Sequence, residues 1–170
     1  MLKQNLLNLM SEQVVAEYYS AYLYLSMSAY CDQTGFPGFA NWMYTQAQEE
    51  MAHGTHIFEY ILERGEVPTL GQIDMPPAEF NGLVDVFTQV LKHEEYVTEL
   101  INNIATAAME EKDHATYNFI QWYITEQVEE EASAGLILQK VIFIGDNSSM
   151  LYNLDTELAA RVFTDPFAAE

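Results

Sequence analysis

The sequence contains a single cysteine, Cys31, and very few basic residues. Its 170 residues include 6 lysines and arginines against 26 aspartates and glutamates, for a formal net charge of −20. One cysteine excludes an intrachain disulfide, and also an iron–sulfur or structural zinc site built from four cysteines of one chain. The excess of negative charge repels nucleic acid phosphates and anionic lipids, and it attracts cations. We therefore expect neither nucleic acid nor a membrane as a partner.

Prolines and long apolar runs are also scarce. The 5 prolines lie at positions 37, 68, 76, 77 and 166, so the stretches between them are long enough for long helices. No apolar run is long enough to span a bilayer, and the first residues lack the apolar stretch of a secretory signal. We therefore expect a cytoplasmic protein, or an organellar one if a transit peptide has been removed.

The proline-free stretches show helical apolar periodicity. With 49 % apolar residues, the chain is expected to form one domain over residues 1–170. The expected helices span about residues 5–32, 37–64, 83–111, 115–144 and 149–162. Tight turns within the first and second pairs of helices predict two antiparallel hairpins, and residues 66–81 are long enough to cross the whole bundle. These lengths predict an all-α four-helix bundle with one long crossover and a short fifth helix.

A pattern of ligand-type residues occurs twice at the same spacing. The two sets, in chain order, are Glu17, Glu50 and His53, and Glu94, Gln127 and Glu130. In each set the second residue follows the first by 33 positions, since 50 − 17 = 127 − 94 = 33, and the third follows three residues later. Two helices with one inward carboxylate, and two with a ligand pair at i and i+3, can form a two-iron site in a bundle. The repeat therefore predicts a diiron centre.

The residues of this repeat lie on the faces expected to form the core. At spacings of three and four, the stripe on each long helix is apolar at both ends and polar in the middle. Burying an unpaired carboxylate costs on the order of several kcal/mol, and most basic residues lie toward helix ends or off these stripes. A pair of metal ions would compensate the charge. The alternative is a metal-free network of carboxylates, His53 and tyrosines with raised pKa values, and we favour the metal.

The donor set indicates which metals fit. Carboxylate oxygens with one imidazole suit iron or manganese better than copper or other ions that prefer thiolates. Glu50 and His53 share a helix face and can reach one ion, and Glu17 completes this first site. Glu50 can also bridge two ions, because a carboxylate has two oxygens.

The second ion is expected to be held more weakly. Glu94 and Glu130, together with the bridging Glu50, offer only oxygen donors. Gln127 carries a neutral amide, which is expected to orient a water or to bind weakly rather than to hold iron tightly. The two halves of the repeat therefore predict two unequal metal sites.

The repeat, together with residues 49–53 and 122–131, resembles prokaryotic-type non-haem ferritin, a member of the ferritin-like diiron family. The resemblance extends over almost the whole chain, including the fifth helix. It implies a shell of 24 copies in which Fe(II) is oxidised by O₂ at a ferroxidase centre in each bundle and stored as ferric mineral. It assigns the first iron to Glu17, Glu50 and His53, the second to Glu50, Glu94 and Glu130, and a neighbouring position to Gln127.

The resemblance also implies roles for residues around the centre. Tyr24 matches a tyrosine that can supply an electron to O₂; the alternative is a packed aromatic side chain with a satisfied hydroxyl. A third iron site in prokaryotic relatives matches Glu49, Glu126, Glu129 and Glu130; the alternative for the first three is a solvated inner surface. Gln46 stands where some relatives carry a carboxylate that helps iron to move, so the sequence leaves that transfer route in doubt.

Other members of the superfamily fit less well. A bacterioferritin would carry a histidine in place of Glu130, and although Met51 matches its haem-ligating methionine, we expect no haem. Rubrerythrin-like peroxidases share the bundle but add an iron domain built from four cysteines, which a chain with only Cys31 cannot form. A diiron oxidase that stores nothing would need an organic substrate pocket, and a fifth helix with a leucine face argues for a subunit contact instead. A metal-free acidic interaction bundle is the remaining alternative.

Overall fold

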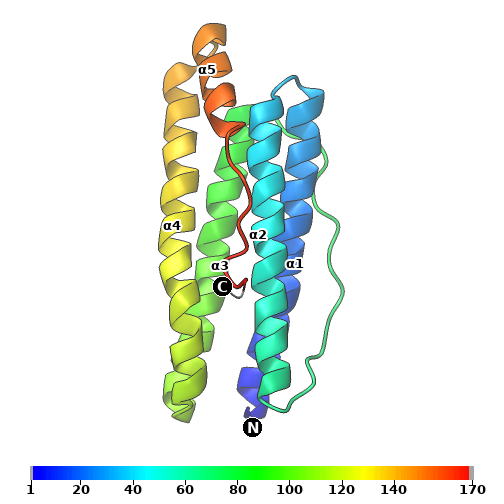
Figure 1. Cartoon of the computed structure of the whole chain (residues 1–170), viewed down its shortest axis with the longest axis vertical. Coiled ribbons are helices and arrows are strands. Elements are labelled where there is room, and N and C mark those ends of the chain that lie inside the picture. Colours follow the sequence, from blue (N-terminus) through cyan, green and yellow to red (C-terminus); the bar gives the residue numbers. More distant parts are fainter. Residues whose placement is uncertain (1, 169–170) are drawn as a thin grey trace.

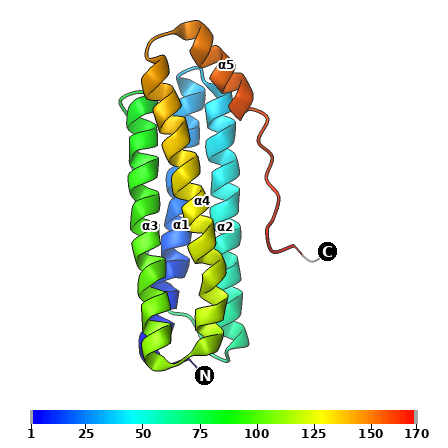
Figure 2. The same ribbon diagram turned by 90° about the vertical axis from the view of Figure 1, so that its left-hand side faces the viewer.

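The chain folds into four long helices and one short one. The computed structural model describes residues 2–168. The helices are α1 (Gln4–Gln33), α2 (Pro37–Glu63), α3 (Leu83–Glu111), α4 (His114–Ile144) and α5 (Ser148–Leu158). Helices α1 to α4 form the bundle (Figure 1), and α5 lies across one of its ends (Figure 2). The all-α four-helix bundle with a short fifth helix is therefore as predicted, and the ends of the four long helices lie within one residue of the expected ones.

The long crossover joins α2 to α3. Residues 64–82 run along the outside of α1 from one end of the bundle to the other (Figure 1), so α2 and α3 point in the same direction. Hydrogen bonds to α1 hold this segment in place. The backbone N–H of Thr69 donates to Ser11 Oγ over 3.2 Å, and Ser26 Oγ donates to the carbonyl of Pro77 over 2.6 Å. The crossover thus joins the hairpin of α1 and α2 to the hairpin of α3 and α4, and each hairpin can supply half of a shared centre.

The core consists of two apolar clusters with a polar layer between them. Tyr24, Phe39 and Phe87 belong to one cluster, and Met10 and Ile101 belong to the other. The buried polar layer consists of Gln13, Glu17, Ser20, Gln46, Glu50, His53, Glu94, Gln127 and Glu130. The sequence stripes predicted this burial on all four helices.

Cys31 lies in the core, where it packs as a small apolar residue. Its thiol is free and buried. Burial, reinforced by the negative charge of Asp155, raises the pKa of the Cys31 thiol to about 12. Because the thiolate is the reactive form of cysteine, this thiol is unreactive at neutral pH.

Helix α5 ends at Leu158, four residues before the expected end at 162. The side-chain amide of Asn41 meets this end of the helix: its Nδ2 lies 3.4, 3.3 and 2.9 Å from the carbonyl oxygens of Leu158, Ala159 and Arg161. Asn41 of α2 thus offers its two N–H groups to carbonyls at the end of α5, where helix carbonyls lack partners within the helix. Residues 159–168 then leave the helix and turn along the bundle (Figure 1).

Helix α5 is fixed to the start of α2 by Asp155. Its Oδ1 accepts hydrogen bonds from the backbone N–H groups of Gly38 over 2.8 Å and of Phe39 over 3.0 Å. These groups belong to the first turn of α2, where N–H groups lack partners within the helix. The approach requires glycine, because a Cβ at Gly38 would lie 1.7 Å from the backbone oxygen of Asp155.

Replacement of Gly38 by alanine should therefore destabilise the protein by about 1–3 kcal/mol, the usual cost of overpacking. Gly135→Ala is the matched control, because nothing lies within 4 Å of a Cβ at that helical position. It should stabilise the protein by up to about 1 kcal/mol through helix propensity. Thermal unfolding should show opposite shifts of about 2–4 °C per kcal/mol for a chain of this size. Equal melting temperatures for the two variants would contradict the packing described.

Candidate metal centre

Three buried side chains from two helices meet in the middle of the bundle. Glu17 of α1 and Glu50 and His53 of α2 each offer one ligand atom, and these atoms lie within 4.8 Å of one another. His53 Nδ1 lies 3.5 Å from Glu50 Oε2. Glu17 Oε2 and His53 Nε2 are buried without a hydrogen-bond partner among the described residues. Because buried polar atoms normally have partners, these two atoms are available to bind a cation.

The carboxylates expected for the second ion are held by neighbouring side chains. The Tyr24 hydroxyl donates a hydrogen bond to Glu94 Oε1. Gln46 Nε2 donates to Glu50 Oε1 over 3.0 Å and to Glu130 Oε1 over 2.8 Å. Glu94 and Glu130 do not belong to the group within mutual ligand distance. The structure thus brings the three residues expected for the first ion within ligand distance of one another, and does not do so for Glu94 and Glu130.

Two glutamines position these carboxylates. Gln127 Nε2 lies 3.2 Å from the backbone oxygen of Glu94 and 3.2 Å from its Oε2, so Gln127 fixes Glu94 on the neighbouring helix. From the sequence, Gln46 was considered only because some relatives have a carboxylate at this position. Its bridge between Glu50 and Glu130 was missed, because this contact joins residues 84 positions apart and depends on how α2 and α4 pack.

Burial and mutual repulsion set the protonation of the centre. Desolvation, with the nearby charge of Glu50, raises the pKa of Glu94 to about 8 and holds the pKa of Glu17 well above its usual value. Desolvation and the charges of Glu94 and Glu50 likewise hold the pKa of Glu130 well above its usual value. Negative charge is costly in this pocket, so a divalent ion that binds here must displace protons.

Glu50 and His53 behave differently from the other groups. Burial alone would raise the pKa of Glu50, but the hydrogen bond and positive charge of His53 outweigh burial and lower it. Burial alone would lower the pKa of His53, but its hydrogen bond to Glu50 and the charge of Glu50 raise it. Each of the two side chains therefore stabilises the charged form of the other, and Glu50 is the carboxylate of the centre whose pKa is lowered.

Aromatic side chains enclose the centre. Tyr24 is buried, and burial followed by the charge of Glu94 raises the pKa of its hydroxyl well above the usual value. The Trp122 ring lies 5.3 Å from the His53 ring, measured between centroids. The Tyr123 hydroxyl donates to the backbone oxygen of His53 over 3.0 Å and lies 3.0 Å from His56 Nδ1. This wall keeps water away from the ligands and fixes the backbone of α2.

Of the residues expected for a third iron, Glu130 is buried in the polar layer and the other three lie nearer the edge of the bundle; among the described residues they are not grouped at ligand spacing. The carboxylate of Glu49 pairs with the guanidinium of Arg161, while Glu126 is half-buried and Glu129 is exposed. The pairing of Glu49 with Arg161 was not expected. Residue 161 was placed on the fifth helix, and a contact across 112 positions has no local sequence signal.

No helix within residues 2–168 is both long enough and apolar enough to cross a bilayer.

Comparisons with known proteins agree over most of the chain. A family model described as a ferritin-like domain matches residues 7–143. The bacterial non-heme ferritin of Staphylococcus epidermidis is 40 % identical over 165 residues, covering 97 % of this chain and 99 % of that protein. A probable bacterial non-heme ferritin-like protein of Haemophilus influenzae is 39 % identical over 158 residues, covering 93 % and 96 %.

Solved structures give the same result. A closed form of the Archaeoglobus fulgidus ferritin, made by site-directed mutagenesis, matches with a TM-score of 0.94 and 45 % identity, covering 96 % of this chain and 100 % of that chain. The open-pore ferritin of the same organism matches with a TM-score of 0.93 and 45 % identity, covering 95 % and 98 %. The family model, the curated relatives and these structures together show that the chain belongs to the ferritin family and is similar over nearly its full length to non-haem ferritins.

Proposed function

We propose that the protein is an iron-storage ferroxidase, which oxidises Fe(II) with O₂ in each bundle and stores ferric oxyhydroxide inside a shell of 24 copies. The buried group of Glu17, Glu50 and His53, with two ligand atoms that lack hydrogen-bond partners, carries this proposal. Similarity to non-haem ferritins supports storage and assembly into a shell. The negative charge of the chain would concentrate Fe(II) at the protein.

The residues of the centre have separate tasks in this reaction. Glu17, Glu50 and His53 bind the first Fe(II), and Glu50 shares its second oxygen with the ion held by Glu94 and Glu130. Gln46 and Gln127 hold these carboxylates ready by hydrogen bonds. Each Fe(II) gives one electron to O₂, and the carboxylates release their protons as the ions bind.

Further roles around the centre belong to the same proposal. Tyr24, hydrogen-bonded to Glu94, is placed to supply an additional electron. Glu49, Glu126 and Glu129, together with Glu130, would hold a third iron on its way from the centre to the stored mineral. We expect no haem: Met51 stands where bacterioferritin has its haem-ligating methionine, but a methionine on a helix usually serves packing.

Glu94 and its neighbour Glu95 provide the test. Glu94→Ala should slow the initial oxidation of Fe(II) by about 10- to 100-fold, because it removes a ligand of the second ion. Glu95 is exposed and adjacent in the sequence, so Glu95→Ala should oxidise Fe(II) at the wild-type rate. The measurement is the rise in near-ultraviolet absorbance after aerobic addition of Fe(II), with sedimentation to verify that the shell is intact. Oxidation by Glu94→Ala at the wild-type rate would remove the second site from the proposal.

A further inference from the structure

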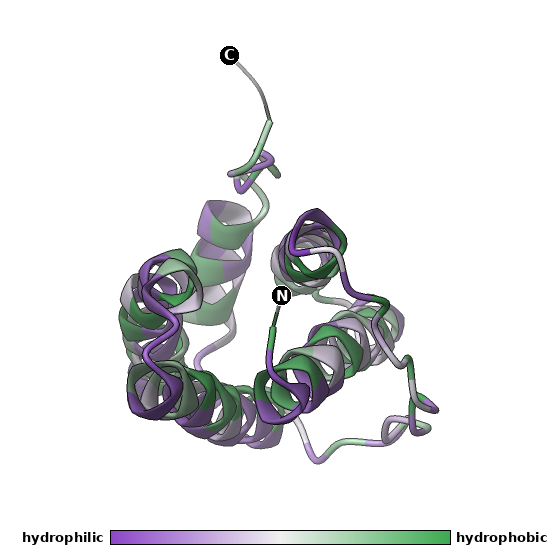
Figure 3. Ribbon diagram, turned by 90° about the horizontal axis from the view of Figure 1, so that it is seen from below, coloured by the Kyte–Doolittle hydropathy of each residue, from purple (hydrophilic) through white to green (hydrophobic). Residues whose placement is uncertain are grey.

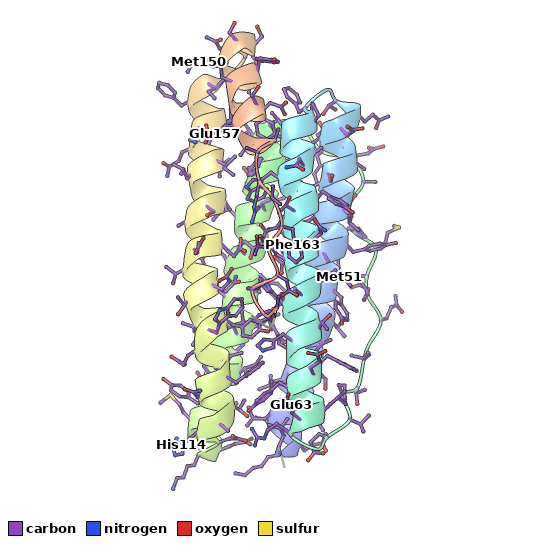
Figure 4. The ribbon with its side chains drawn as sticks, in the orientation of Figure 1. Met51, Glu63, His114, Met150, Glu157 and Phe163 are labelled. Atoms are coloured by element: carbon purple, nitrogen blue, oxygen red, sulfur yellow. The ribbon has the colours of Figure 1, made fainter. Side chains whose placement is uncertain are left out.

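The segment after α5 covers an open side of the bundle. No Cα atom of α2 lies within 8 Å of one of α4, whereas α1 packs on α2 and α3 packs on α4. Residues 159–168, called the tail below, descend from α5 along this side (Figure 1) and lie outside the four helices when the bundle is viewed along its axis (Figure 3). Phe163 marks the tail between α2 and α4 in Figure 4. The tail therefore lies over the side of the bundle from which His53 can be approached.

Arg161 anchors the upper end of the tail on α2. Its guanidinium lies 4.6 Å from the centre of the Trp42 ring, and its Nη2 pairs with the carboxylate of Glu49. The neighbouring Asn41 holds the backbone oxygen of Arg161 over 2.9 Å. The side chains of Arg161 and Glu49 are 26 % and 20 % exposed, so the pair is largely shielded from water.

Phe167 anchors the lower end of the tail on both α2 and α4. Its ring stacks on His56 of α2, with centroids 3.7 Å apart, and meets Trp122 of α4 edge-on at 4.6 Å. The same ring lies 6.1 Å from that of His53, which is only 2 % exposed. Phe167 thus helps to seal the imidazole that would bind the first iron.

Between its two anchors the tail is loosely packed. Val162, Thr164, Asp165 and Pro166 are exposed. A hollow of about 370 Å³ lies between the tail and α2, lined by residues that include His56, Glu59 and Phe163. The tail is therefore held mainly at its two ends, around Arg161 and around Phe167.

The contact between Arg161 and Glu49 places a positive charge on a carboxylate that is expected to bind a metal ion. The chain has 6 lysines and arginines against 26 acidic residues, and one of those few cations lies on a carboxylate expected to bind the third iron. Arginine does not lose its proton in proteins, so Glu49 carries a permanent cationic partner. A metal ion that binds Glu49 must displace this guanidinium.

We propose that the tail is a built-in competitor for the third cation position: Arg161 occupies Glu49 as a tethered cation, Phe167 covers His53, and a metal ion reaches Glu49 only when the tail is displaced. The inference rests on the proposed function, because Glu49 matters to iron only if iron passes from the centre toward the stored mineral. In this proposal Arg161, which lies outside the four-helix bundle, helps to control the passage of iron from the centre toward the stored mineral.

Titration of the metal-free, full-length protein with Zn(II), monitored by calorimetry, tests whether Arg161 competes with a metal ion for Glu49. Zn(II) allows this test without redox chemistry. In Arg161→Ala the first two equivalents should bind as in wild type, and the third should bind about tenfold more tightly, as expected for loss of one charge-assisted hydrogen bond. Val162→Ala changes a neighbouring side chain that is 79 % exposed and should leave all three affinities unchanged. Arg161→Ala combined with Glu49→Gln should lose the gain.

Two further variants keep the test informative if Arg161→Ala folds poorly. Arg161→Lys keeps the charge without the planar guanidinium and should give an intermediate affinity for the third equivalent. Phe167→Ala releases the other anchor and should raise this affinity about threefold, because each contact increases the effective concentration of the other.

The outcomes separate the two proposals. A third equivalent that binds equally in wild type and in both Arg161 variants, after two normal equivalents, would overturn the role of the tail and leave the diiron centre standing. Absence of the first two equivalents from wild type would instead overturn the proposed function.

Discussion

Replacement of Glu50 by alanine should abolish tight binding of the first divalent ion and slow the initial oxidation of Fe(II) by more than about 100-fold. Glu50 belongs to the preformed group with Glu17 and His53, and it is the carboxylate proposed to serve both ions. Changes next to metal ligands already cost about 10- to 100-fold, and loss of a shared ligand should cost more. Stopped-flow absorbance gives the rate, and calorimetry with Zn(II) gives the affinity.

Glu59→Ala is the control for this variant, since Glu59 is an exposed glutamate on the same helix and should leave both quantities unchanged. The fold should survive the substitution of Glu50, because alanine leaves fewer charges in the core. Circular dichroism can verify this. If the Glu50 variant binds Zn(II) as tightly as the Glu59 variant does, the centre does not lie where we place it.

The metal-free protein should lose stability as the pH rises from about 5 to about 8. The pKa of Glu94 is raised from 4.5 to about 8 by burial and by the charge of Glu50. Between these values the folded chain retains a proton that the unfolded chain has released. The contribution of Glu94 is therefore present in full below pH 4.5 and is lost as the pH rises through 8, at on the order of 1.4 kcal/mol per pH unit.

The pKa values of Glu17 and Glu130 are shifted in the same direction, whereas that of Glu50 is lowered and opposes them. Thermal unfolding in the presence of a chelator at pH 5, 6.5 and 8 measures the sum. Glu94→Gln mimics the protonated acid, so this variant should show a flatter dependence and a higher melting temperature than wild type at pH 8. Addition of Zn(II) should restore the stability that the wild-type protein loses at pH 8. Metal ligands must be deprotonated to bind, and an ion that binds only the folded state stabilises it. An equally steep dependence in Glu94→Gln would show that other groups cause the effect.

Local periodicity was enough to predict the helices and the polar layer of the core. The spacing of 33 residues between Glu17 and Glu50 is informative because two long helices joined by a tight turn keep fixed relative heights. A residue on the core stripe of one helix therefore meets a definite level of the next. For the same reason, the burial of Gln127 and Glu130 on α4 could be predicted before their partners on other helices were known.

Contacts that depend on the packing of distant segments could not be predicted in this way. The apolar pattern of the sequence continues beyond Leu158, where α5 ends, and the contact of this end with Asn41 of α2 has no local signal. The bridge made by Gln46 requires a particular distance between α2 and α4, which no single helix specifies. Arg161 and Glu49 likewise meet because the tail reverses direction after α5, and neither residue carries a local signal for the other.

The position of the two tryptophans has a practical consequence. Trp42 lies under Arg161 at one end of the tail, and Trp122 lies against Phe167 at the other. These are the only tryptophans in the sequence, and the emission of an indole ring depends on the groups that touch it. The protein therefore carries an intrinsic fluorescent label at each anchor of the tail, and exchanging either tryptophan for phenylalanine would assign the signal to one end.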